Sequence, residues 1–164
     1  MLNSRVNKLR KILQEKNLGG FLISNFHNIL YLTGFKTLTE NEREAWMLVT
    51  KNHIYLFTDS RYVVDDKLLI SKLITPKSGL INHLIEIVDK EKIQRLGFEG
   101  DDLKVNELQR IKDHLTNIEL IFLEKLIIKI REIKDEKEID NLSIACKIAE
   151  QCLDEIVKSI CPGT

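Results

Sequence analysis

The sequence is poor in the residues that mark several classes of protein. Its 164 residues include three cysteines and two prolines. An odd number of cysteines argues against a disulfide framework and indicates a reducing, cytosolic setting. No apolar run approaches the roughly 18 residues that span a bilayer, and the N-terminus carries no apolar signal segment. We therefore expect a cytoplasmic protein with no membrane partner.

An excess of charge of either sign is also lacking. The chain has 25 basic and 25 acidic side chains, which give a formal net charge of zero. A nucleic-acid-binding domain is expected to be strongly basic, so nucleic acid is not an expected partner. Hydrophobic residues make up 43% and charged residues 30%, as in ordinary soluble globular proteins. The length suffices for one domain with a core, or for one domain and part of another.

Short motifs for metals and phosphates are missing as well. The sequence has no HExxH, no cysteines paired at zinc spacing and no glycine-rich phosphate loop. Cys146 and Cys152 stand six apart on an expected helix and point in different directions. Asp65–Asp66 and Asp101–Asp102 are typical of solvated turns or helix starts. No metal site is predicted in this chain from such patterns.

The patterns that are present alternate between strand and helix. The first segment has an apolar stripe of Val6, Leu9, Ile12 and Leu13, and its basic residues, Arg5, Lys8, Arg10, Lys11 and Lys16, are expected to face solvent. A hairpin at Lys51–Asn52 makes part of the sheet antiparallel. The pattern predicts an α/β layer sandwich with a mixed sheet. We expect strands at 21–23, 45–50, 53–58, 70–75, 95–98 and 118–123, and helices at 80–88 and 103–115.

The stretch Asn28–Phe35 follows the first strand and reads as a short helix closed by Gly34. Its polar entry, Asn25 to Asn28, stands at the carboxyl end of a strand, where ligands tend to bind in open α/β sheets. A capped surface helix is the alternative interpretation.

Arg61 lies in Thr58–Tyr62, at the end of a strand where a helix is expected to begin at Asp59 or Ser60. Its guanidinium can hold a carboxylate through two hydrogen bonds, or it can pair with a nearby acid and fix the loop. The spacing alone favours the second, structural interpretation.

A long helix closes the sequence. Asp135 and Glu138 have the spacing of a capping box, and the helix that follows has a wide apolar face. We expect this helix to belong to a second domain. The predicted division is a first domain at 1–123, a linker at 124–134, and the first helix of a further domain at 135–164.

Four stretches in order carry a family resemblance. They are Asn28–Phe35, Thr58–Tyr62, Gly97–Glu99, and Arg131–Asp135 followed by Glu138–Ile139. Together with Ala145 and Pro162–Thr164, the set resembles the N-terminal domain of the creatinase, prolidase and Xaa-Pro aminopeptidase family, over essentially the whole chain. The resemblance implies a three-layer, ribonuclease H-like fold with an approximately six-stranded mixed sheet between helices.

The resemblance further implies a metallopeptidase whose second domain cleaves the bond before proline. In that domain two Asp, one His and two Glu bind two divalent metals, usually manganese, cobalt or zinc, which activate a water. None of these five ligands has a counterpart in this chain, so we expect it to hold no catalytic residue, no metal and no cofactor. Dipeptidase and aminopeptidase activity stay open.

Members of this family are commonly dimers or larger homo-oligomers in which the N-terminal domain of one subunit walls the active site of another. The resemblance therefore implies that His27, Asn28, Tyr31, Arg61 and Tyr62 line a pocket for short proline-containing peptides. Two alternatives stay open. One is a non-peptidase relative, either a creatine hydrolase or a metal-free protein-binding module. The other is a stand-alone oligomerisation or binding unit.

Overall fold

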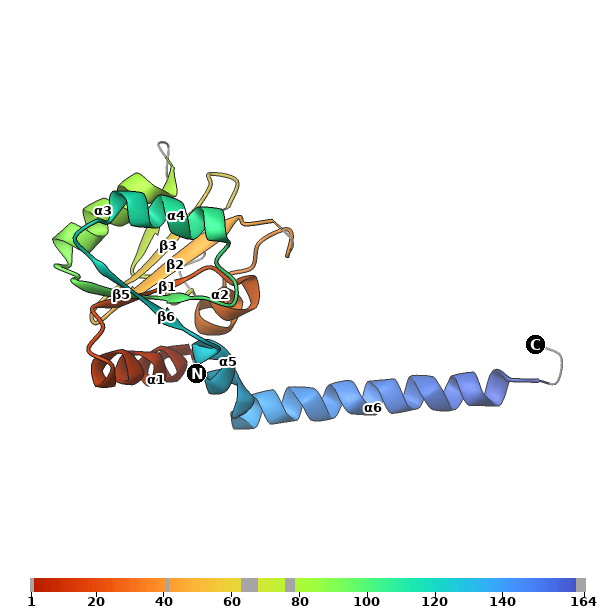
Figure 1. Cartoon of the computed structure of the whole chain (residues 1–164). Helices are drawn as coiled ribbons and strands as arrows, with labels where there is room; N and C mark the ends of the chain where they lie inside the picture. The colour runs from red at the N-terminus through yellow and green to blue at the C-terminus, as the bar shows by residue number, and fades with distance from the viewer. Residues whose placement is uncertain (1, 41, 63–67, 76–78, 162–164) are drawn as a thin grey trace. The chain divides into compact units, whose positions relative to one another are not determined.

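The computed structural model describes residues 2–40, 42–62, 68–75 and 79–161. The chain divides into two compact units, residues 1–130 and residues 131–164 (Figure 1). No helix in these described ranges is long and apolar enough to cross a membrane.

The first unit is built on a six-stranded mixed sheet, which confirms the predicted α/β fold. The strand order is β4-β3-β2-β1-β5-β6. Strand β2 pairs antiparallel with β1 and β3, whereas the pairs β1–β5, β5–β6 and β3–β4 are parallel. The strands are β1 (Gly20–Ile23), β2 (Ala45–Thr50), β3 (Ile54–Thr58), β4 (Lys72–Ile74), β5 (Arg95–Glu99) and β6 (Glu119–Leu123).

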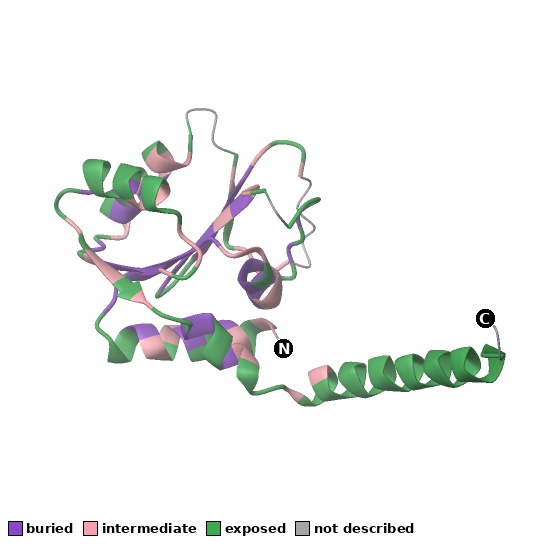
Figure 2. Cartoon of the chain, turned by 45° about the vertical axis from the view of Figure 1, so that its right-hand side comes forward, coloured by how far each residue is buried: buried purple, intermediate pink, exposed green. Residues whose placement is uncertain are grey.

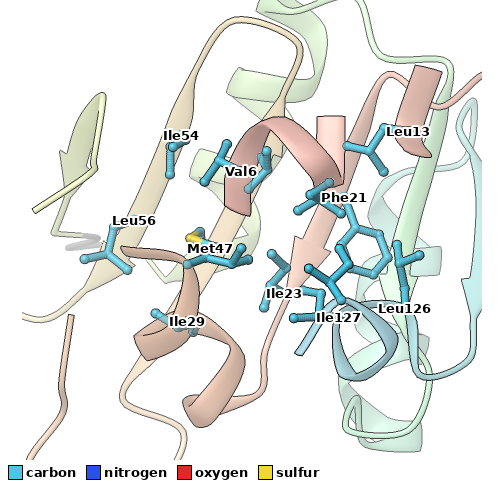
Figure 3. Close-up of a cluster of buried hydrophobic side chains, with 14 of the residues drawn as sticks. Val6, Leu13, Phe21, Ile23, Ile29, Met47, Ile54, Leu56, Leu126 and Ile127 are labelled. Carbon is cyan, nitrogen blue, oxygen red and sulfur yellow. The ribbon is translucent and has the colours of Figure 1, made fainter. Parts of the chain in front are cut away.

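Helices α1 (Leu2–Glu15), α2 (Phe26–Thr33) and α5 (Leu126–Glu132) cover one face of this sheet. The apolar stripe of α1 packs there as predicted, because Val6, Leu9 and Leu13 are buried. Figure 3 shows Val6 and Leu13 beside the strand residues Phe21 and Met47 of the same cluster. Burial of this kind contributes roughly 1.5–3 kcal/mol for each large apolar side chain.

Helices α3 (Leu80–Lys90) and α4 (Val105–His114) cover the opposite face. Their buried residues, Leu84, Ile87, Val88 and Ile111, pack with the strand residues Leu22, Leu48 and Phe57 in a second cluster. The central strands β1, β2, β3 and β5 lie buried between the two helical layers (Figure 2), which gives the unit three layers. Two packed faces explain why β1, β2 and β3 read as nearly continuous apolar runs.

Two of the stretches that carry the family resemblance, Asn28–Phe35 and Gly97–Glu99, each contain a glycine that the fold requires. Gly34 has φ +81° and ends α2, and its N–H donates to the carbonyl of Leu30. Glycine takes this left-handed conformation without the strain that a Cβ causes. In β5, a Cβ on Gly97 would stand 2.8 Å from Cδ2 of Phe21 and 3.1 Å from Cδ1 of Leu18. A side chain at position 97 would therefore disturb the core.

The predicted linker, 124–134, contains a helix. Helix α5 falls within the predicted linker 124–134, but its Leu126, Ile127 and Ile130 are buried in the core of the first unit. The first unit accordingly runs to residue 130.

The second unit consists of the helix α6 (Glu136–Ser159) and the residues beside it. The predicted capping box is present: the Asp135 carboxylate accepts from the N–H of Glu138, and the Glu138 carboxylate accepts from the N–H of Asp135. No residue of α6 is buried, and Cys146 and Cys152 are free, exposed thiols.

Candidate functional site

Several connections of the sheet meet at one edge. Strands β1, β3 and β5 point the same way, so their carboxyl ends lie together, and the antiparallel β2 begins there. This edge therefore gathers the residues that follow β1, β3 and β5, and Glu44, which precedes β2. The carboxyl edge of an open α/β sheet is the usual place for a ligand site.

Glu99, the last residue of β5, holds the turn that leads from β1 into α2. Its Oε2 accepts from the N–H groups of Ser24 and Asn25, both at 2.8 Å, and its Oε1 accepts from Nδ2 of Asn28 at 2.6 Å. Asn25 in turn caps α2, because its side-chain oxygen accepts from the N–H of Asn28 at 3.1 Å. One buried carboxylate thus fixes the polar entry to α2.

Burial raises the pKa of Glu99 to about 7, although the three donors favour the ionised form. The nearby Asp102 carboxylate raises it further. The side chain is 6% exposed, which places it beneath the surface of the edge. Glu99 is therefore suited to holding the turn rather than to contacting a ligand.

Arg43 fixes the loop that precedes β2. Its Nε and Nη2 donate to the two carboxylate oxygens of Glu107 at 3.2 and 3.0 Å, and its Nη1 pairs with the carboxylate of Asp102. It also donates to the carbonyl oxygens of Ser24 and Asp102, and its guanidinium lies 4.9 Å from the ring centre of Trp46. This one side chain ties the loop to the end of β1 and to the start of α4.

Asp102 belongs to the same network. Its carboxylate accepts from Oγ of Ser24 at 2.7 Å and from Nδ2 of Asn25 at 3.0 Å. Burial opposes its ionisation, but the hydrogen bonds from Ser24, Arg43 and Asn25 outweigh burial and hold its pKa below the ordinary value. Asp101 and Asp102 lie in a turn, one of the two predicted settings, but the Asp102 carboxylate is held by hydrogen bonds and is not solvated as predicted. Asp65–Asp66 lie outside the described residues.

Glu44 organises a second cluster at this edge. Its carboxylate accepts from the Tyr62 hydroxyl at 2.7 Å, from the N–H of Thr39 at 3.1 Å and from Nη2 of Arg61 at 3.1 Å. Hydrogen bonds from Tyr62 and Thr39 lower the pKa of Glu44. The Thr58 hydroxyl donates to the Glu44 carbonyl at 2.9 Å, so the loop before β2 is joined to the end of β3.

Arg61 also pairs with Asp59, to which its Nε donates at 2.9 Å. The structural pairing favoured by the spacing is thus present. The Arg61 side chain is 58% exposed, and within the described part of the chain its Nη1 has no hydrogen-bond partner. Residues 59–62 form a turn, and the helix predicted after it falls on residues 63–67, outside the described ranges.

A polar cavity of about 290 Å³ opens between α2, the loop before β2 and the turn after β5. Side chains of both charges line it: Asn25, His27, Glu40, Glu42, Asp102 and Lys104. His27 is 53% exposed, and its Nε2 lies 3.9 Å from Oε2 of Glu40. Arg43 lines the cavity too, but its donors are engaged in the network described above. Oppositely charged groups in one cavity suit a ligand that carries both charges.

The structure separates the five predicted pocket residues. His27 lines the cavity, Asn28 is buried beneath it on Glu99, and Arg61 and Tyr62 reach it through Glu44. Tyr31 lies elsewhere, against α1: the Arg5 guanidinium stands 4.2 Å from its ring centre and donates to its carbonyl at 2.9 Å. Arg5 therefore does not face solvent as predicted.

Four residues of this edge were missed from the sequence: Arg43, Glu44, Glu99 and Asp102. For Glu99 the sequence offers a usable signal, an acidic residue at the end of an apolar strand. Such a residue is rarely buried without hydrogen-bond donors, so the pattern indicates that donors surround it. Arg43 gave none, since its partner Glu107 is 64 residues away in a helix that reads as solvated. Among the described residues, no group of three or more His, Cys, Asp or Glu is placed to hold a metal ion.

Comparison with known proteins adds to this geometry. The sequence model of the Creatinase/Prolidase N-terminal domain matches residues 5–133. A solved Xaa-Pro dipeptidase from Bacillus anthracis is 29% identical with a TM-score of 0.85, and the match covers 100% of this chain and 45% of that one. An X-Pro aminopeptidase from Thermotoga maritima is 25% identical with a TM-score of 0.79, over 94% of this chain and 43% of that one.

A curated relative, the uncharacterized peptidase YqhT of Bacillus subtilis, is 26% identical over 161 residues, which are 97% of this chain and 44% of that protein. The chain thus spans less than half the length of these relatives.

Proposed function

Because the chain belongs to the creatinase/prolidase N-terminal domain family, we propose that it is the non-catalytic N-terminal domain of a metal-dependent Xaa-Pro dipeptidase or aminopeptidase. In this role it joins subunits in a homodimer or larger homo-oligomer and walls the active site of a neighbouring subunit. The observation that carries the proposal is the similarity to the dipeptidase of Bacillus anthracis, which covers 100% of this chain and 45% of the dipeptidase.

Hydrolysis itself is assigned to a further domain of the longer protein. There, two Asp, one His and two Glu are proposed to hold two divalent ions, manganese, cobalt or zinc, which supply an activated water when bound. The described residues of this chain do not fit such a metal pair. Their contribution is to bind, orient and enclose the substrate, in a cytoplasmic enzyme.

The polar cavity supports a role in enclosing short peptides. A dipeptide is a zwitterion with an ammonium group and a carboxylate a few bonds apart. The cavity offers acidic groups at Glu40 and Glu42 and a basic group at Lys104. A wall of this kind favours a substrate with both termini over the interior of a long chain, which has neither charge.

The two hydrogen-bond clusters support the wall in a fixed shape. Arg43 and Glu44 are adjacent residues of the loop before β2. Arg43 joins this loop to α4 through Glu107, and Glu44 joins it to the end of β3 through Thr58. Side chains held by packing and hydrogen bonds keep a site in its productive geometry. Arg61 stands at the exposed side of this support, with Nη1 left for a partner subunit or a substrate carboxylate.

The test uses the complete protein that contains this chain, assayed for hydrolysis of Xaa-Pro dipeptides with added manganese, cobalt or zinc. We expect Arg61→Ala to lower kcat/KM about tenfold, the loss of one charge-assisted hydrogen bond. Arg95→Ala is the matched control, because Arg95 pairs with Glu119 and begins β5 at the opposite edge of the sheet. It should leave kcat/KM unchanged.

Two results would overturn the proposal. If Arg61→Ala alters neither kcat/KM nor the oligomeric state, Arg61 is not part of the wall. If the complete protein hydrolyses creatine, or no Xaa-Pro peptide with any of the three metals, the non-peptidase alternative replaces the peptidase.

A further inference from the structure

A second cavity lies at the other edge of the sheet, between α1, the residues before β1 and the β2–β3 turn. It has a volume of about 450 Å³, within the range of roughly 300–1,000 Å³ usual for small-molecule sites. Three basic side chains line it, Arg10, Lys11 and Lys51, together with the carboxamides of Asn7, Gln14 and Asn17. Its lining contains no acidic residue.

The basic groups of this cavity lack ion-pair partners in the part of the chain that the structure describes. Within the described residues, none of Arg10, Lys11 and Lys51 forms an ion pair. In contrast, Arg43 and Arg61 each face two carboxylates. Three like charges around one cavity repel one another, and an anion bound among them relieves that repulsion.

Arg10 is placed to contact such an anion. Its Nε donates to the carbonyl oxygen of Thr50 at 3.0 Å, which fixes the guanidinium against the end of β2. Among the described residues neither Nη group of Arg10 has a hydrogen-bond partner, so the two can make a bidentate contact with an oxyanion. Burial lowers the pKa of Arg10, because this half-buried charge loses water without gaining a counter-charge.

We propose that this cavity binds a small organic phosphate. Three cations around one cavity call for an anionic group of more than one charge, and a phosphate monoester carries about −1.5 to −2 at pH 7. A peptide carboxylate carries only one. The carboxamides can bond hydroxyl or carbonyl groups of the organic part, and Leu13 and Leu18 supply an apolar floor. The site is separate from the peptide-facing cavity and does not depend on the proposed function.

The experiment is a titration of the whole 164-residue chain with inorganic phosphate, as a stand-in for the phosphate group, followed by calorimetry and by amide chemical shifts. Saturable binding is expected, with shifts concentrated in residues 7–18 and 51. The double variant Lys11→Ala/Lys51→Ala should weaken binding about tenfold or more. Lys8→Ala/Lys16→Ala is the control, because it removes the same charge from exposed residues that do not line the cavity.

Equal weakening in the two double variants would overturn the proposal, since general charge attraction would then explain the binding. Absence of saturable binding, or shifts centred on other residues, would overturn it as well. Nucleoside monophosphates and sugar phosphates compared in the same titration identify the organic part: a compound that binds more tightly than inorganic phosphate supports the amide and leucine contacts. If none does, the assignment of an organic phosphate is wrong.

Discussion

Removal of the Arg43 side chain tests how the carboxyl edge is held together. Arg43→Ala deletes the ion pairs to Asp102 and Glu107, whose side chains are 24% and 20% exposed. Loss of a hydrogen bond to a charged group costs roughly 1.5–3 kcal/mol, and loss of a partner of a fully buried pair costs roughly 3–5 kcal/mol. Both acids keep other donors here, so we expect a loss of about 3 kcal/mol in the free energy of unfolding.

The assay is urea unfolding followed by tryptophan fluorescence. Trp46 is the one tryptophan of the sequence and lies in β2, so the signal reports the first unit. With an m-value of about 2 kcal/mol per molar urea, the expected loss lowers the midpoint by about 1.5 M. Arg61→Ala is the matched control, because Arg61 also meets two carboxylates. Its side chain is 58% exposed and that of Asp59 is 42% exposed, so this pair contributes little. The Glu44 side chain is only 4% exposed, but it keeps the Tyr62 hydroxyl and the N–H of Thr39 as donors, so we expect a smaller loss than for Arg43→Ala. If Arg43→Ala lowers the midpoint no more than Arg61→Ala does, the account of the Arg43 network is wrong.

Two further predictions concern β5. Burial raises the pKa of Glu99 to about 7 from 4.5, so between these pH values the folded state binds a proton that the unfolded state does not. The free energy of unfolding therefore falls as pH rises through this window, by about 3 kcal/mol in total. Urea midpoints of the unmodified protein and Glu99→Gln, compared from pH 5 to 8, should therefore show this slope only in the former; parallel curves would refute it. Gly97→Ala should lower the free energy of unfolding by about 1–3 kcal/mol, because its Cβ would meet Phe21, and thermal unfolding with an unchanged midpoint would contradict this packing.

Local chemistry explains the parts of the fold that were predictable. Gly34 ends α2, and Asp135 with Glu138 caps α6, because caps depend on residues a few positions apart. The pairing of Arg61 with Asp59, two residues away, belongs to the same class. The apolar stripe of α1 and the hairpin of β2 and β3 follow from residue periodicity in the same way.

The polar networks were not predictable in this way. Arg43 meets Glu107 only because the sheet brings the start of β2 beside α4, and Glu99 meets Asn28 across 71 residues. Tyr31 shares helix α2 with Asn28, but its ring and its carbonyl contact Arg5 of α1, 26 residues away, and local spacing does not reveal such a contact. The burial of α5 was not predictable for a related reason: its three apolar residues form a short stripe in the sequence, and only the packed sheet shows which core receives them.

The central claim is that this chain serves as the N-terminal wall of an Xaa-Pro peptidase. The most direct measurement is hydrolysis of a set of dipeptides by the complete protein, with and without added divalent metal. The account predicts metal-dependent cleavage of Xaa-Pro dipeptides and none of matched Xaa-Ala dipeptides. Cleavage that does not depend on proline, or no cleavage with manganese, cobalt or zinc, would contradict it.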